Sequence, residues 1–315
     1  DPWPMPHPQP TAATRVALDE LLALAPLARG ATLAEVRRSA AARGGGHASR
    51  WRGRGVDFRE SRVYQAGDDI RHMDWRVTAR SGTAHTKLFE EEREHGLLLM
   101  VDFNPGMRFG TRERFKSVQA ARAAALLAWM VTAGGDRVGM LGFGGGVRDE
   151  VKPAGGRRGC LRGLRALRDW DAAAGSAVEN LSAALERARR LLRPGMRLIL
   201  VSDGFSADEA AWSVLGRLAG RHELGCLLVS DAIERAPPPP GRYPMSFDGD
   251  HRLVDFGDSR LRETWTRGFA AVRETVRSRF TRIGARVVDL ATDGDLRRAI
   301  MPFTSRSRGP VDSQA

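Results

Sequence analysis

The sequence predicts an α/β fold, a Rossmann-like and mainly parallel sheet with helices on both faces. First, short apolar runs such as residues 97–101 are continuous rather than alternating, as expected for strands covered on both faces. Second, these runs alternate with helical patterns of about ten or more residues, which is typical of βαβ units. Third, a chain of 315 residues is long enough to bury a large core.

The beginning of the chain does not follow this alternation. Proline at every second position excludes regular structure in residues 1–11. Residues 14–43 contain two short helical patterns, which Pro26 and Gly30 interrupt. Three successive glycines at 44–46 predict a flexible joint.

Residues 47–95 contain a charged block and a strand-like stretch at 83–92, so we expect an arm that packs on the main domain. The expected organisation is a Pro-rich start with a helical extension (1–46), this arm (47–95), a sheet core (96–232), a hairpin, long helix and last strand that complete the core (233–301), and a flexible tail (302–315).

From Gly96 onward strands and helices alternate. Three glycines at 144–146 predict the turn of a hairpin between the second strand and residues 147–151. Ser206 and Glu209 have the spacing of a capping box and predict a helix start after the third strand. The expected strands are 97–101, 138–143, 198–201, 224–229 and 286–290, the expected helices are 112–133, 159–169, 178–192 and 261–280, and a surface hairpin is expected at 243–256 after the prolines at 237–240.

Composition restricts the classes of function. The net charge is +12, and the basic residues other than Lys87, Lys116 and Lys152 are arginines. A basic surface favours polyanions, but these arginines are scattered without interleaved aromatic residues, which argues against nucleic-acid binding. Cys160 and Cys226 are too few for a disulfide framework or a zinc site. Without a run long enough for a membrane span or an apolar leader, we expect a cytoplasmic protein.

Two acidic residues each follow a buried strand. Asp102 ends the strand at 97–101, and Asp203 follows the strand at 198–201. Because ligands bind at the carboxyl ends of such strands, we expect both side chains at that edge of the sheet. Two adjacent carboxylates repel each other unless a cation, an arginine or a shared proton lies between them.

Two stretches resemble a known bacterial family, domain of unknown function 58. The first stretch carries its shared pattern, Arg62, Tyr64, Gly67, Asp68, Asp69, Arg71, Asp74, Trp75, Ala79 and Arg80. The second is the strand that ends in Asp102-Phe103-Asn104-Pro105-Gly106-Met107. The resemblance covers about residues 50–290 and implies a von Willebrand factor A-like domain.

The resemblance also implies a metal-ion-dependent adhesion site, in which Mg²⁺ is held by an Asp-x-Ser-x-Ser run, a distant Thr and a second-strand Asp. Asp102 and Asp203 match the two acids, so Asp102, Asn104 and Asp203 are the candidate ligands. The site is degenerate, since Asn104 and Gly106 replace the serines and residues 176–181 contain no Thr. Ser176 or Ser182 would have to substitute for it. The alternative is a tight turn in which backbone N–H groups and nearby arginines hold both acids.

The signature block has two interpretations. Arg62, Arg71, Arg76 and Arg80 lie near Asp68, Asp69 and Asp74 in sequence, which predicts a network of ion pairs with Trp75 and Tyr64 packed within it. The same block is also a candidate docking surface for a partner protein.

The function that follows is a non-catalytic, von Willebrand A-like adaptor. Members of the family are commonly encoded beside a MoxR-type AAA+ ATPase, which the resemblance implies as a partner that acts with this chain on an unknown client. One alternative is a metal-dependent hydrolase that uses Asp102 and Asp203. Another is arginine-driven nucleic-acid binding. No Walker A, HExxH or GxSxG motif supports an enzyme.

Overall fold

The computed structural model describes residues 11–29, 31–33, 56–65, 68, 70–91, 96–247 and 250–306. The chain forms two compact units, the first comprising Asp1–Val36 with His95–Ala315 and the second Arg37–Glu94. The expectations for residues 1–10, for the glycine joint at 44–46 and for residues 307–315 lie outside the described part.

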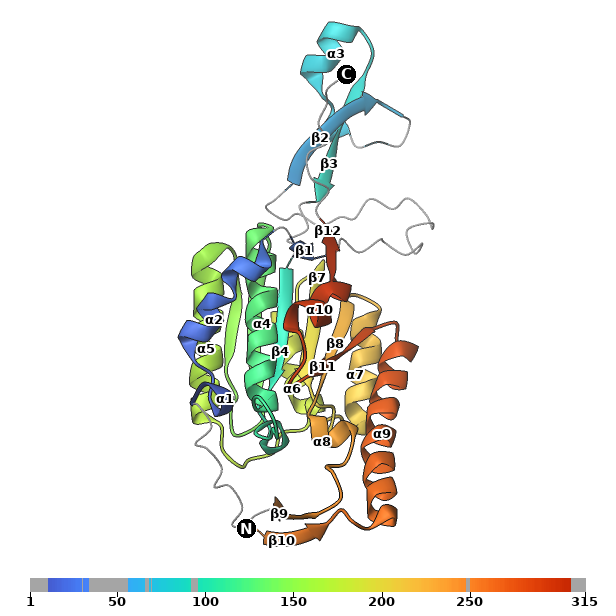
Figure 1. The fold of residues 1–315 in the computed structure, drawn as a ribbon. Helices are drawn as coiled ribbons and strands as arrows, with labels where there is room; N and C mark the ends of the chain where they lie inside the picture. Colours follow the sequence, from blue (N-terminus) through green and yellow to red (C-terminus); the bar gives the residue numbers. More distant parts are fainter. Residues whose placement is uncertain are drawn as a thin grey trace, which may run out of the picture. The chain divides into compact units, whose positions relative to one another are not determined.

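A six-stranded sheet forms the centre of the first unit (Figure 1). Its strands are β4 (Gly96–Asp102), β5 (Arg137–Phe143), β6 (Glu150–Ala154), β7 (Met196–Ser202), β8 (Glu223–Ser230) and β11 (Arg286–Ala291). Their order is β11-β8-β7-β4-β5-β6, and every neighbouring pair is parallel except β5 with β6. The predicted fold class is therefore confirmed. The strand order reverses between β4 and β7, which is where sheets of this type bind ligands.

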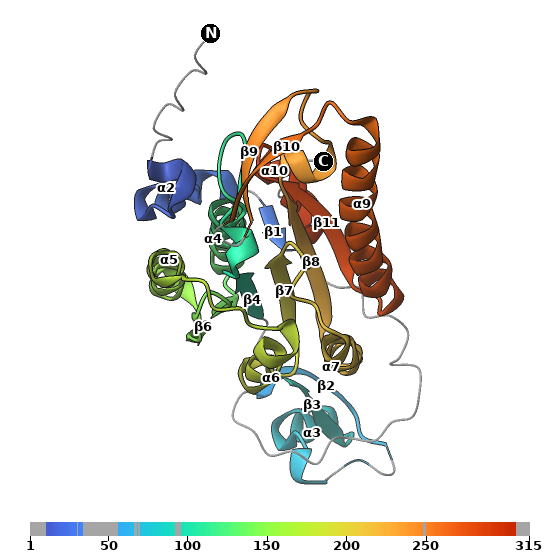
Figure 2. The same cartoon turned by 90° about the horizontal axis from the view of Figure 1, so that it is seen from below.

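Helices cover both faces of the sheet (Figure 2). The helices on one face are α4 (Lys116–Ala133) and α5 (Gly156–Ala173), and those on the other are α6 (Leu181–Leu191), α7 (Glu209–Ala219) and α9 (Ser259–Arg282). Successive residues of β4 alternate between the two cores: Leu99 packs with α4 and α5, whereas Leu98 packs with α6 and α7.

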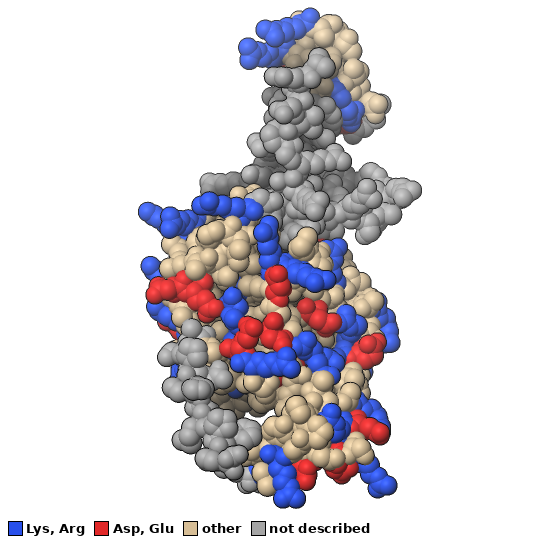
Figure 3. Space-filling model, viewed as in Figure 1, with Lys and Arg blue, Asp and Glu red and all other residues tan. Residues whose placement is uncertain are grey.

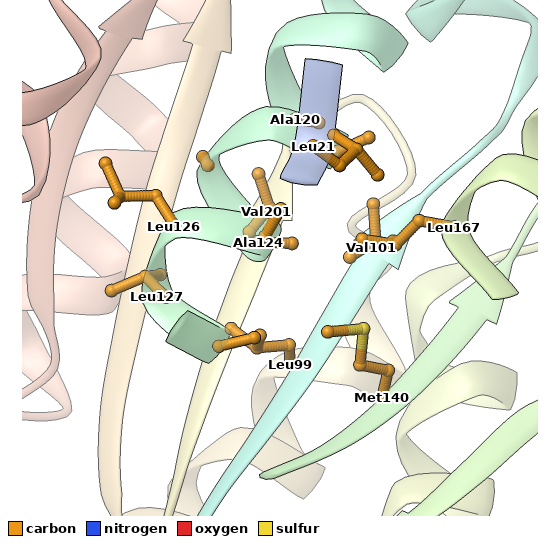
Figure 4. Packing of buried hydrophobic residues seen from close by; sticks show 14 of the residues in the cluster. Leu21, Leu99, Val101, Ala120, Ala124, Leu126, Leu127, Met140, Leu167 and Val201 are labelled. Carbon is orange, nitrogen blue, oxygen red and sulfur yellow. The ribbon is translucent and has the colours of Figure 1, made fainter. Parts of the chain in front are cut away.

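The Ala-rich face of α4 explains how closely this helix packs on the sheet (Figure 4). Ala120 and Ala124 are fully buried in the same cluster as Leu99, Val101 and Met140. Small side chains allow close approach, and dense packing makes each truncation costly, about 2–5 kcal/mol for a buried Leu→Ala change.

The N-terminal extension belongs to the first unit. It contains α1 (Thr11–Thr14), α2 (Leu18–Ala23), the 3₁₀ helix η1 (Ala25–Ala28) and β1 (Ala31–Leu33). The Trp129 indole of α4 donates a hydrogen bond to the Leu21 carbonyl at 3.0 Å, and Glu20 forms ion pairs with Arg114 and Arg122.

The C-terminal segment contains more structure than the sequence indicates. It has α10 (Leu296–Ile300), the 3₁₀ helix η4 (Met301–Phe303) and β12 (Thr304–Arg306), and β12 pairs antiparallel with β1. Residues 302–306, expected in the tail, thus include the buried Phe303 and a strand. The β1–β12 pair was not predicted, because its two three-residue strands carry no periodic pattern and lie at opposite ends of the chain.

The hairpins and the connecting helices complete both units. In the first unit, α8 (Ala232–Arg235) precedes the hairpin of β9 (Arg242–Phe247) and β10 (Asp250–Asp255), which lies where the sequence predicts it. In the second unit, β2 (Val56–Val63) pairs antiparallel with β3 (His85–Glu91), and η2 (Ile70–His72) and α3 (Trp75–Ser81) connect them. None of the described helices combines the length and apolarity needed to cross a membrane.

Candidate functional site

The structure brings Asp102 and Asp203 to the same edge of the sheet, between β4 and β7. The two strands are parallel and in register, with Val101 opposite Val201, so their carboxyl ends coincide. Both carboxyl groups are buried, and the charge of Asp203 acts directly on Asp102. Both acids lie at the edge that the sequence predicts, and the structure places them where the strand order reverses.

Asp102 is completely buried, and both oxygens of its carboxyl group accept hydrogen bonds. Oδ1 accepts from the backbone N–H and the side-chain amide of Asn104, at 2.9 and 2.8 Å. Oδ2 accepts from the hydroxyls of Ser202 and Ser206, at 2.6 and 3.0 Å. These donors compensate for the loss of water around a buried carboxyl group.

Burial raises the pKa of Asp102 to about 7, and the negative charge of Asp203 acts in the same direction. The hydrogen bonds from Ser202, Asn104 and Ser206 act to lower the pKa but do not outweigh burial. Asp102 therefore changes its charge near neutral pH, and its protonation relieves the repulsion between the two acids.

Ser206 has a different role from the predicted one. It does not cap α7, because Asp208 takes the N-cap position and Ser206 donates its hydroxyl to Asp102. The predicted capping box at Ser206 and Glu209 is wrong. The spacing is right for a cap, but the buried acceptor 104 residues earlier in the chain holds the hydroxyl instead.

Asn104 connects the loop after β4 to the loop before α6. Its Oδ1 accepts from the backbone N–H of Glu179 at 2.8 Å, and its Nδ2 donates to the Glu179 carbonyl at 3.0 Å. The Glu179 carboxylate in turn accepts from the backbone N–H of Gly144 and pairs with Arg187 at 3.2 Å. Gly144 adopts a left-handed conformation (φ +81°), and a Cβ there would lie 2.5 Å from Asn104. The side chain of Asn104 therefore acts as a clamp between loops.

Lys116, the first residue of α4, supplies the cation of this edge. Its side chain is only 2% exposed, and Nζ lies 2.8 Å from Asp203 Oδ2 and 2.6 Å from Glu234 Oε1. Burial by itself would lower the pKa of Lys116, but the charges of Asp203 and Glu234 outweigh it and raise the pKa above its ordinary value. The rings of Phe109 and Phe205 lie 6.0 and 5.7 Å from Nζ.

Glu234 is held by the capping box of α8. The backbone N–H of Asp231 donates to Glu234 Oε2 at 2.9 Å, while Thr111 and Thr292 donate their hydroxyls to the Asp231 carboxylate. Burial acts to raise the pKa of Asp231, but these hydrogen bonds outweigh it and lower the pKa. The loop thereby fixes Oε1 of Glu234 against the ammonium group of Lys116.

The candidate metal ligands do not fit Mg²⁺. This ion requires near-octahedral oxygen ligands at about 2.0–2.1 Å. Asp102 has both oxygens engaged by neutral donors, Asn104 uses its one amide oxygen for Glu179, and Asp203 is paired with Lys116. Throughout the described ranges, no three His, Cys, Asp or Glu side chains gather in a way that could hold a metal ion.

Neither serine considered as a substitute ligand is shown bonded to Asp102 or Asp203. Ser182 donates its hydroxyl to Asp208 at 2.6 Å, and Ser176 is exposed in the loop before α6. The interpretation as a tight turn describes the loop better, since Pro105–Met107 forms the 3₁₀ helix η3. That interpretation expected nearby arginines to hold the acids, whereas the cation that pairs with Asp203 is Lys116.

The signature block lies in the second unit. Arg62 pairs with Asp68 at 2.7 Å, and the backbone N–H of Gln65 and this arginine lower the pKa of Asp68. Asp74 caps α3 by accepting from the N–H of Val77, and it also accepts from the hydroxyl of Ser61 at 2.7 Å. Part of the expected polar network is therefore present.

Trp75 departs from the prediction, because its side chain is 67% exposed rather than packed between the charged residues. Tyr64 is half-buried, and Arg71, Ala79 and Arg80 are exposed. Gly67 and Asp69 lie outside the described residues.

Sequence reasoning missed Lys116 and Glu234. The sequence does contain a signal for Lys116. It is one of three lysines in a chain whose other basic residues are arginines, so a lysine stands out as an exception. The compact ammonium fits between two close carboxylates, whereas a planar guanidinium needs more space. No local pattern identifies Glu234.

The family model described as protein of unknown function DUF58 matches residues 60–275. The chain belongs to this family. Proteins described as uncharacterized, from Mycobacterium bovis and Mycobacterium tuberculosis, are 32% identical to this DUF58 chain over 262 residues, which is 82% of each chain.

Solved structures similar to this DUF58 chain include the conserved hypothetical protein BatB from Bacteroides thetaiotaomicron, at 16% identity and a TM-score of 0.41 over 66% of this chain and 95% of that one. Another is an aerotolerance-related membrane protein from Bacteroides fragilis, at 13% identity and a TM-score of 0.43 over 66% and 96%. The fold of this DUF58 chain is a mixed α/β fold with a mostly parallel central sheet.

Proposed function

We propose that this chain is a non-catalytic adaptor that binds protein partners, and that it acts with a MoxR-type AAA+ ATPase in the cytoplasm to mature or remodel a client. The observation that carries this proposal is the character of the carboxyl edge. Asp203, Lys116 and Glu234 are buried and paired there, while the apolar side chains of Phe205 and Val178 beside them are exposed.

Two exposed apolar side chains flank the buried charges. Phe205 follows Asp203 and is 53% exposed, and Val178 precedes Glu179 and is 71% exposed. The two loops that carry them are joined, because the N–H of Leu181 donates to the carbonyl of Ser206 at 2.8 Å. Exposed apolar groups on a rigid loop framework favour contact with another protein.

The second unit offers an additional surface. Ile70 and Trp75, at η2 and the start of α3, are 62% and 67% exposed. Tryptophan is enriched among residues that dominate binding energy at interfaces. The ion pair of Arg62 with Asp68 and the cap of α3 by Asp74 hold this region in a defined conformation.

The hydrolase alternative receives less support from the geometry. A general base or a metal-activated nucleophile must reach its substrate, but Asp102 is enclosed by donors and Asp203 is paired with Lys116.

Nucleic-acid binding is also less favoured. On the face of the first unit seen in Figure 3, basic and acidic side chains are interspersed rather than gathered in a patch of one sign. Ion pairs such as Arg114 with Glu20 and Arg112 with Asp293 reduce the positive field that a polyanion needs.

The test is retention of the tagged full chain by the MoxR-type ATPase encoded in the same genome, with ATP and without it. We expect nucleotide-dependent retention that Phe205→Ala or Trp75→Ala weakens by roughly tenfold or more, as for a side chain at the centre of an interface. Leu253→Ala is the matched control, because Leu253 is 65% exposed on β10.

Two results would contradict the proposal. One is a wild-type chain that the ATPase does not retain under either condition. The other is a set of variants in which Phe205→Ala and Trp75→Ala bind as well as Leu253→Ala does.

A further inference from the structure

Lys116 lies where a cation is otherwise unfavourable. It is the first residue of α4, and the partial positive charge of a helix N-terminus disfavours a cationic side chain there. Burial of the ammonium adds a desolvation cost. Both costs are offset only because Asp203 and Glu234 each place an oxygen within 2.8 Å of Nζ.

The ammonium also contacts the same acid that lies beside one of the ligand positions of the metal-binding pattern. The second serine of that pattern is Gly106 here, and a Cβ at Gly106 would lie 3.3 Å from Asp203 Oδ2. This is the oxygen that Lys116 contacts. Residue 106, where the pattern has its second serine, and the ammonium of Lys116 therefore both lie beside Asp203 Oδ2.

We infer that Lys116 is a built-in replacement for a divalent cation. In the wild-type chain the edge is organised without metal, because the ammonium already pairs with both Asp203 and Glu234. Removal of the amine leaves two buried carboxylates that face the vacated space, and these form a latent divalent-cation site.

The chemistry of the vacated space suits Mn²⁺ or Mg²⁺. Sites for Mg²⁺ commonly use one or two carboxylates, with waters as the remaining ligands. The two carboxylate oxygens lie 2.8 and 2.6 Å from the position of Nζ, so small shifts bring them to bonding distance of an ion. A divalent ion would also balance the two negative charges, whereas Lys116 leaves one in excess.

The experiment measures thermal unfolding of the full chain with EDTA, Mg²⁺ or Mn²⁺. The unfolding temperature of the wild type should not change between these conditions. Lys116→Ala should unfold at lower temperature in EDTA and regain stability with saturating Mn²⁺, and at a concentration of 100 times Kd the ratio of folded to unfolded chain rises about 100-fold. A double variant, Lys116→Ala with Asp203→Asn, should lose this rescue.

Lys116→Met is the matched control. Its side chain fills the vacated space without charge, so the variant should be destabilised but insensitive to Mn²⁺. A Lys116→Ala chain that folds and shows no saturable effect of Mn²⁺ would overturn the latent site.

A measurement on the wild type decides the outcome even if no variant folds. The wild-type chain should reduce the paramagnetic resonance signal of free Mn²⁺ no more than an Asp203→Asn chain does. If the Asp203→Asn chain does not fold, buffer without protein is the reference. Stoichiometric loss of the signal would show a metal site in the wild type and refute the inference.

Discussion

Asn104→Ala tests whether this side chain is a clamp between loops or a metal ligand. The substitution removes the donor and the acceptor that bind the backbone of Glu179, a residue only 7% exposed. Each buried polar group left without a partner costs about 1–3 kcal/mol. Two such groups, partly relieved by loop relaxation, predict a loss of roughly 2–4 kcal/mol in the free energy of unfolding.

Urea unfolding of the full chain, followed by circular dichroism, measures this loss. Asn180→Ala is the control, because Asn180 is exposed and makes no capping hydrogen bond, so a change within about 0.5 kcal/mol is expected. Equal stability of the Asn104→Ala and Asn180→Ala chains would refute the clamp.

Asn104→Asp separates the two roles further. It loses the amide donor and places a second carboxylate beside Asp102, so the clamp predicts destabilisation that Mg²⁺ does not relieve. A metal ligand predicts the opposite, since an added carboxylate strengthens Mg²⁺ binding. Recovery of stability in Mg²⁺ would therefore assign Asn104 to a metal site.

Three further predictions concern the same chain. The pKa of Asp102 is about 7 in the folded chain and 3.8 ordinarily, so between these pH values the folded chain keeps a proton that the unfolded chain releases. The free energy of unfolding should therefore fall as the pH rises from 5 to 7, by roughly 2–3 kcal/mol more in the wild type than in Asp102→Asn. Urea titrations at each pH measure this difference. Gly144→Ala should cost roughly 1–3 kcal/mol more than Gly135→Ala in the same assay, since both glycines have positive φ but only Gly144 has a backbone atom 2.5 Å from the added Cβ. Burial raises the thiol pKa of Cys160 to about 11 and of Cys226 to about 12, so iodoacetamide should label neither in the folded chain and both in urea, and rapid labelling of the folded chain would contradict their burial.

Several features of the fold could be predicted because their causes are local. A strand covered on both faces has to be apolar throughout, so residues 97–101 identify β4 without knowledge of its neighbours. Three left-handed glycines at 144–146 form the predicted turn between β5 and β6. Helix starts were less certain, as α7 shows, because a hydroxyl can satisfy a distant acceptor instead of a nearby N–H.

The sequence by itself determined that Asp102 and Asp203 share one edge, because parallel strands in one sheet present their carboxyl ends together. Only the tertiary structure decided what lies between them. Lys116 is 87 residues from Asp203 and 118 residues from Glu234 along the chain. They meet because the strand order places the start of α4 and the ends of β7 and β8 at the same edge, and a buried carboxylate pairs with whichever cation the packing brings within reach.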